Sequence, residues 1–147
     1  MQVLLLSIMA KCGVYTHVRD LATHLQKMGF RPFIGLISNS TARNMFKVSK
    51  EDSTAMEQSL NGIPYFYYDS NTSLFETVKD IGIDIVHAHS PLVLKHGVYL
   101  KARLNLPFVV TLHGVINWSK HHSTELRMAD KIIAIGPEVA NSCGDNF

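Results

Sequence analysis

The sequence has few of the features that mark secreted, membrane-spanning or highly charged proteins. Its two cysteines, Cys12 and Cys143, lie far apart and fit neither a disulfide framework nor a paired metal motif. Its 14 lysines and arginines nearly balance 12 acidic residues, which argues against nucleic acid as a partner. The longest apolar run, residues 3–10, is shorter than the roughly 20 helical residues that cross a bilayer, and no signal-peptide leader precedes it. We therefore expect a cytoplasmic protein without a membrane span.

Several complete catalytic and binding motifs are also missing. The dinucleotide fingerprint Gly-x-Gly-x-x-Gly and the Walker phosphate loop do not occur, and only Gly13 stands at the first turn. No Gly-x-Ser-x-Gly elbow is present, and Cys12 has no evident base partner, so a hydrolase has little support. The acidic cluster of a response-regulator receiver is absent after the first apolar run. A non-catalytic interaction module of another kind remains an alternative.

What is present indicates one α/β domain over residues 1–147, because 46% apolar content is enough to fill a core. Short apolar runs alternate with amphipathic segments, which is typical of a Rossmann-like, doubly wound parallel sheet. The predicted strands cover residues 3–10, 32–37, 64–68, 83–89, 107–113 and 131–135. The predicted helices cover residues 14–28, 74–81 and 92–104, and residues 38–61 are expected to be a loop with one short helix at most.

Ligands of such sheets bind at the carboxyl ends of the strands, so the residues after each strand are the site candidates. Gly13 follows the first strand and precedes a helix, where free N–H groups and the helix dipole favour an anion such as phosphate. The alternative is a glycine that only permits a tight turn.

His87 and His89 end the fourth predicted strand and point to the same side, because strand side chains alternate. Two imidazoles suggest metal ligands, but a zinc site needs three or four donors and no further ligand is close in the sequence. We therefore predict no metal. Histidines that are hydrogen-bonded beneath a helix are the alternative, and His89, at the strand tip, is the better candidate for a functional residue.

His113 is the strongest single candidate, because it ends the fifth strand and Gly114 lets the chain turn away after it. An imidazole there can donate to a sugar hydroxyl or an anion, or act as an acid or base. A histidine bonded to backbone in a turn is the alternative. Farther on, residues 118–122 are either an active-site flap or a solvated helix surface.

The segment over residues 43–50 combines three cations with three apolar residues, namely Arg43, Lys47, Lys50, Met45, Phe46 and Val48. Such a segment can rest on an anionic membrane surface, which would make the protein peripheral to the membrane. An ordinary solvated loop is the alternative, because two acids follow directly.

Four segments, in this order, resemble the N-terminal half of group 1, family 4 glycosyltransferases of the two-domain GT-B architecture. They are residues 12–22 (CGVYTHVRDLA), 84–90 (DIVHAHS), 109–114 (VVTLHG) and 129–135 (ADKIIAI). The resemblance implies retaining transfer of a sugar, of the hexosyl type, from a nucleotide-sugar donor to an acceptor. It also implies that no metal or other cofactor takes part, and that the N-terminal domain mainly receives the acceptor.

The resemblance assigns roles to individual positions. Gly13 matches the second glycine of a family pair that approaches the donor diphosphate, although Cys12 replaces the first. His113, followed by Gly114, matches a histidine that faces the transferred sugar, and His89 matches one on the acceptor side. Tyr15 stands where many members carry Glu or Gln.

Family members continue into a second domain with the nucleotide site and a Glu-x7-Glu pair. This chain stops at Phe147, so we expect it not to transfer sugar without that C-terminal domain. A nucleotide-sugar epimerase of GT-B architecture is the alternative enzyme. It would need carboxylates at the strand ends, where Asp69 is the only evident acid.

Overall fold

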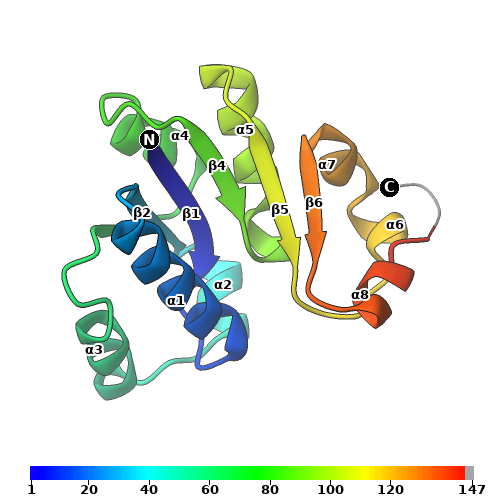
Figure 1. The fold of residues 1–147 in the computed structure, drawn as a ribbon. Helices are drawn as coiled ribbons and strands as arrows, with labels where there is room; N and C mark the ends of the chain where they lie inside the picture. Colours follow the sequence, from blue (N-terminus) through cyan, green and yellow to red (C-terminus); the bar gives the residue numbers. More distant parts are fainter. Residues whose placement is uncertain (145–147) are drawn as a thin grey trace.

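The computed structural model describes residues 1–144 and forms one parallel sheet of six strands (Figure 1). The strands are β1 (Gln2–Ile8), β2 (Arg31–Ile37), β3 (Tyr65–Tyr68), β4 (Ile85–Ala88), β5 (Phe108–Leu112) and β6 (Lys131–Ala134). Their order is β3-β2-β1-β4-β5-β6, which is the order of the Rossmann fold. The predicted fold class is confirmed, and all six predicted strands are present with ends that differ by a few residues.

In the sequence, helices follow each strand, and α8 comes after the last one. They are α1 (Gly13–Lys27), α2 (Ser40–Met45), α3 (Lys50–Gln58), α4 (Asn71–Val78), α5 (Leu94–Leu104) after the short 3-10 turn η1 (Pro91–Val93), α6 (Trp118–His121), α7 (Ser123–Met128) and α8 (Pro137–Asn141). The helix α1 stops before Gly29, whose φ of 87° is a left-handed conformation that glycine adopts without strain.

The expectation for residues 38–61 is wrong, because this segment forms two helices, α2 and α3. The helix α3 has no buried residue, so its sequence shows no apolar period. Its start is fixed instead by a cap, since the Ser49 side chain accepts a hydrogen bond from the Asp52 N–H. The Asn39 side chain caps α2 in the same way by accepting from the Ala42 N–H.

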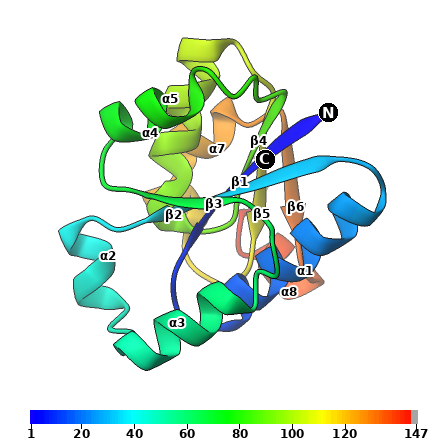
Figure 2. The ribbon, with the colours of Figure 1, turned by 90° about the vertical axis from the view of Figure 1, so that its left-hand side faces the viewer.

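Helices cover both faces of the sheet, as Figure 2 shows. On one face, Val18 and Ala22 of α1 pack with Leu5 of β1 and Ile34 of β2. On the other, α4, α5 and α7 pack on the alternate strand residues, including Leu4 and Leu6 of β1 together with Leu74, Leu100 and Leu126. The continuous apolar strand β1 is therefore buried on both sides.

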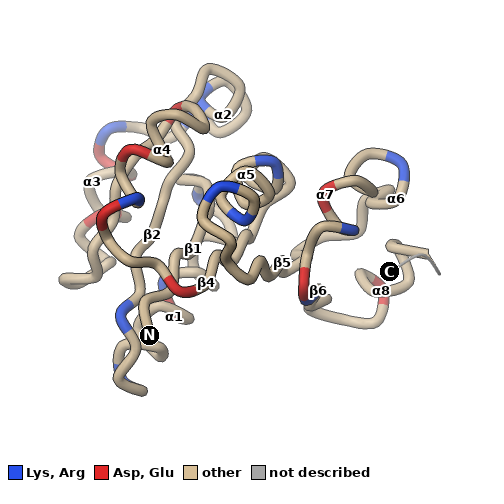
Figure 3. The backbone as a smooth tube through the Cα atoms, turned by 90° about the horizontal axis from the view of Figure 1, so that it is seen from above, with Lys and Arg blue, Asp and Glu red and all other residues tan. Residues whose placement is uncertain are grey.

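Charged residues of both signs lie on many of the helices and loops (Figure 3). Two exposed ion pairs link separate elements: Lys11, after β1, lies 3.4 Å from Asp52 of α3, and Lys101 of α5 lies 2.6 Å from Asp130, before β6. Exposed pairs of this kind contribute little to stability, typically less than about 1 kcal/mol.

The strand order reverses between β1 and β4. The chain leaves β1 toward β2 and β3, whereas from β4 it proceeds toward β5 and β6. The connections after β1 and β4 therefore diverge and leave a crevice at the carboxyl ends of these two strands. In the sheet register, Leu5 lies beside His87 and His87 lies beside Val109. These three positions, and those two residues farther along each strand, face α1 because Leu5 packs on that helix.

Candidate active site

A pocket of about 230 Å³ lies at this crevice. It joins the start of α1 to the segments that follow β4 and β5. Its lining consists of Ile8, Cys12, Val14, Phe46, His89, Ser90, Pro91, His113, Gly114, Ile116 and Trp118. Gly13 lies between two of these residues. The structure thus brings the predicted site residues Gly13, His89, His113 and Gly114 to one rim, while their roles stay predictions.

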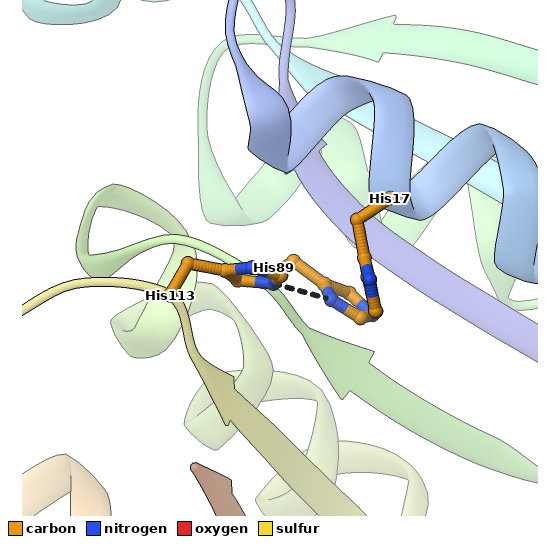
Figure 4. A group of neighbouring side chains, drawn as sticks. All are labelled: His17, His89 and His113. Carbon is orange, nitrogen blue, oxygen red and sulfur yellow. Dashed lines mark hydrogen bonds between the residues drawn. The ribbon is translucent and has the colours of Figure 1, made fainter. Parts of the chain in front are cut away.

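His87 and His89 lie on the same side of β4, as alternation predicts, and their ring centroids are 4.0 Å apart. His87 Nε2 lies 2.8 Å from Thr111 Oγ1, so His87 is hydrogen-bonded within the protein. His89 Nδ1 lies 3.2 Å from His113 Nε2 (Figure 4). The two candidate histidines therefore form a direct pair at the ends of neighbouring strands.

A third histidine, His17, joins this pair from α1 (Figure 4). Its ring centroid is 4.8 Å from that of His113 and 5.6 Å from that of His89. Sequence reasoning missed His17, because it counted only histidines close in the chain. The available signal was its place one turn into a helix that begins at the carboxyl end of β1, beside β4.

His87, His89 and His113 are neutral at neutral pH. Burial lowers the pKa of His87 and of His113 to about 4, and it lowers the pKa of the fully buried His89 well below its usual value. A neutral imidazole has one donor and one acceptor nitrogen, so one ring of the His89–His113 pair donates to the other. His113 can therefore bond to a hydroxyl, but it brings no positive charge to a phosphate.

The start of α1 can supply backbone N–H groups as hydrogen-bond donors to a phosphate. Cys12 occupies the N-cap position and makes no side-chain cap hydrogen bond, so its side chain pairs with none of the first N–H groups of the helix. Gly13 has no positive φ, and a Cβ built on it meets nothing within 4 Å. The backbone therefore does not require glycine there, which removes the physical basis for the tight-turn alternative and leaves room beside the helix start.

The loop after β5 is held in place by Trp118. This buried side chain donates from Nε1 to the Gly114 carbonyl at 3.0 Å. A Cβ on Gly114 would also meet nothing within 4 Å. Residues 118–122 form α6 and its end, with Lys120 and His121 exposed, which agrees with the solvated-helix alternative.

Two other predicted features, the segment 43–50 and Asp69, differ in their relation to the pocket. In the segment 43–50, Met45 is exposed, but Phe46 packs against the core and lines the pocket, so the apolar residues do not form one free face. Asp69 follows the edge strand β3, and its carboxylate accepts from Ser73 Oγ at 2.9 Å. It does not line the histidine pocket. Within residues 1–144, no helix is both long and apolar enough to cross a bilayer.

Solved structures with the same fold are glycosyltransferases of GT-B architecture. Anabaena Alr3699/HepE, in complex with UDP, superimposes with a TM-score of 0.69 at 19% identity, over 97% of this chain and 40% of its own. A glycosyltransferase from Rickettsia africae gives 0.66 at 20% identity, over 91% of this chain and 36% of its own. Acinetobacter baumannii MurG gives 0.65 at 15% identity, over 94% and 42%. This chain thus spans about two fifths of each.

At these identities the structural likeness shows the fold alone. A search of curated proteins by sequence found no significant match. The family model named Glycosyltransferase Family 4 does match, and it covers residues 12–147, which include the start of α1 and the histidines His17, His89 and His113. Because that match spans nearly the whole sequence, the chain belongs to glycosyltransferase family 4.

Proposed function

We propose that this chain is the N-terminal, acceptor-binding domain of a retaining glycosyltransferase that moves a hexosyl group from a nucleotide-sugar donor to an acceptor. The observation that carries the proposal is the convergence of the open start of α1 with His89 and His113 in one pocket at the point where the strand order reverses. Among the similar structures, HepE is described in complex with UDP-glucose.

In this proposal, backbone N–H groups bind the diphosphate and an imidazole binds the transferred sugar. In the transfer, the bond from the anomeric carbon to the diphosphate oxygen breaks and a bond to an acceptor hydroxyl oxygen forms, while the proton of that hydroxyl passes to the departing diphosphate oxygen. The free N–H groups at the start of α1, beside Gly13, stabilise the departing diphosphate. His113 hydrogen-bonds a hydroxyl of the transferred sugar and so fixes the position of the sugar in the pocket. The reaction in this proposal needs no metal or other cofactor.

His89 and Gly114 complete the arrangement. His89 lines the acceptor side of the pocket but is fully buried, so its main action is to orient His113 through their 3.2 Å contact. Gly114 lets a sugar approach the backbone after β5, because no side chain fills the space there.

The donor's base and ribose belong, in this proposal, to a C-terminal domain of the complete enzyme. The chain covers 40% of HepE, so a second domain of the size found there would close the cleft over the pocket. We infer that the 147 residues alone do not transfer sugar. Incubation of the isolated chain with UDP-glucose and other nucleotide sugars is expected to yield no released nucleoside diphosphate, and measurable turnover would refute this part of the proposal.

The role of His113 is tested in the complete enzyme. His113→Ala is expected to lower kcat by about a hundredfold or more, the range typical for loss of one transition-state contact, with thermal unfolding little changed. His121→Ala is the matched control, because His121 is an exposed histidine in the following helix. Activity of His113→Ala near wild type would contradict the assignment.

Gly13 provides an independent test. Gly13→Ala should leave the free energy of unfolding unchanged or slightly higher, because the new methyl group meets no neighbour and alanine favours helix. The same change should weaken binding of the donor diphosphate, since the methyl group occupies the space beside the helix start. Unaltered donor affinity would place the diphosphate elsewhere.

A cytoplasmic location with peripheral membrane contact through residues 43–50 remains part of the proposal. Pelleting with anionic and with neutral liposomes tests the contact, and a Met45→Ser variant tests it most directly because Met45 is 61% exposed. The epimerase alternative would need carboxylates in the histidine pocket, and none of residues 1–144 places one there.

A further inference from the structure

Three histidines from three separate elements form a cluster at the pocket: His89 after β4 and His113 after β5 line it, and His17 from α1 lies beside them (Figure 4). One ring nitrogen of each lies within 4.8 Å of those of the other two. We propose that His17, His89 and His113 together bind a divalent transition-metal ion of the zinc class, with a fourth position left to water or to a ligand in the pocket.

The distances suit such an ion. Zinc binds imidazole nitrogen at about 2.0–2.1 Å with tetrahedral geometry, so two of its ligand nitrogens stand about 3.3 Å apart. His89 Nδ1 and His113 Nε2 are 3.2 Å apart. The His17 nitrogen lies somewhat farther away, within 4.8 Å of the others, and the exposed His17 side chain is free to rotate toward them.

The chemistry of the donors selects the class of metal. All three are imidazoles, which suit zinc, copper, nickel and cobalt ions, and the cluster contains no carboxylate of the kind that magnesium or calcium requires.

Three protein ligands with an open fourth position are typical of catalytic zinc sites, whereas structural zinc sites have four protein ligands. The two apolar cores of the domain contain none of the three histidines. Binding of the ion is therefore expected to add to the stability of an already folded domain.

Direct titration tests the site. Tag-free protein at neutral pH competes with a chromophoric chelator for zinc chloride, and we expect one ion per chain. His17→Ala should weaken the affinity about tenfold or more, a loss typical when a residue that supports a metal is removed. Because His17 is exposed, this change leaves the core filled. The matched control is His24→Ala, an exposed histidine of the same helix, which should bind zinc as the wild type does.

Cobalt(II) gives a second readout that does not depend on affinity alone. Ligation by three histidines in a tetrahedral site produces a strong visible absorption band, whereas loose surface binding leaves cobalt octahedral and weakly coloured. We expect the strong band for the wild type and His24→Ala, and its loss in His17→Ala. Absence of stoichiometric zinc binding by the wild type, or equal zinc affinity of the wild type and His17→Ala, would overturn the site.

One consequence rests on the proposed function, because His113 faces the sugar there. An ion held by His113 competes with the sugar hydroxyl, so zinc should inhibit the complete enzyme at the concentration at which it fills the site. Inhibition that follows the measured binding curve supports both proposals. Zinc binding without inhibition keeps the metal site and refutes the sugar-facing role of His113, whereas the chelator titration above decides the metal site by itself.

Discussion

His96 offers a sharp test of how the core treats a buried histidine outside the pocket. It lies in α5, is 3% exposed, and pairs through Nδ1 with Asn71 Oδ1 of α4 at 2.6 Å. Its Nε2 atom is buried without a partner among the described residues. The ring of Tyr68 from β3 meets it edge-on at 5.2 Å. Burial, and then the charge of Lys95, lower the pKa of His96 to about 4.

The sign of the pH effect follows from this lowered pKa. In the unfolded chain the His96 pKa is about 6.5, so below that pH the unfolded state binds a proton that the folded state refuses. The stability contribution is therefore complete above about pH 6.5 and is lost as the pH falls toward 4. The drop from 6.5 to about 4 corresponds to at most about 3.5 kcal/mol at 1.36 kcal/mol per pKa unit.

Urea unfolding of the wild type and of His96→Gln, at a series of pH values from about 7 to about 4.5, measures this pH-dependent contribution of His96 to the free energy of unfolding. Glutamine retains a donor for Asn71 Oδ1 but does not titrate. We expect His96→Gln to be less stable at neutral pH and to lose less stability than the wild type as the pH falls. The other buried histidines lose the same stability in both proteins and cancel in the difference.

His24→Gln is the control, because His24 is an exposed histidine, and its stability should run parallel to that of the wild type at every pH. Parallel curves for His96→Gln and the wild type would refute the reasoning, since they would mean that His96 binds its proton equally well in both states.

Three further changes test the packing and the helix ends, each by urea unfolding. Gly97→Ala should destabilise by about 1–3 kcal/mol, because the new Cβ would lie 2.2 Å from Phe108 Cε2, and Phe108→Leu in the same chain should recover part of the loss. Ser70→Ala removes the cap of α4 and should cost about 1 kcal/mol, with Ser59→Ala near neutral if capping is the cause. Asp130→Ala leaves the N–H of the buried Phe108 without its 2.8 Å partner and should cost about 1–2 kcal/mol, more than Lys101→Ala, which loses only the exposed ion pair. An equal loss from Asp130→Ala and Lys101→Ala would show that the ion pair, rather than the backbone bond, is what matters.

Much of the secondary structure could be predicted because it depends on local patterns. The apolar run of β1 is long enough for a strand that is covered on both faces, and Gly29 ends α1 in a left-handed conformation. The helix α3 could not be found in this way, because it buries no residue and so carries no apolar period. Only its cap residue, Ser49, marked its start in the sequence.

In the candidate site, too, some features could be predicted from local patterns and others could not. His89 and His113 were predictable because each directly follows a strand of a parallel sheet, and the carboxyl ends of such strands share one edge. Their 3.2 Å contact was not predictable, because it depends on the register of β4 against β5 and on the burial that keeps both rings neutral. His17 was missed because its contact with these two histidines depends on how α1 packs across β1.

The sequence by itself determined the six strands and the helices α1, α4 and α5, the positions of the glycine stops and the residues that end each strand, because these depend on side chains a few positions apart. The tertiary structure alone decided that a helix residue, His17, lies against two strand-end residues more than seventy positions away. Such a contact is fixed by how α1 packs across β1 beside β4, and no local pattern in the chain records that distance.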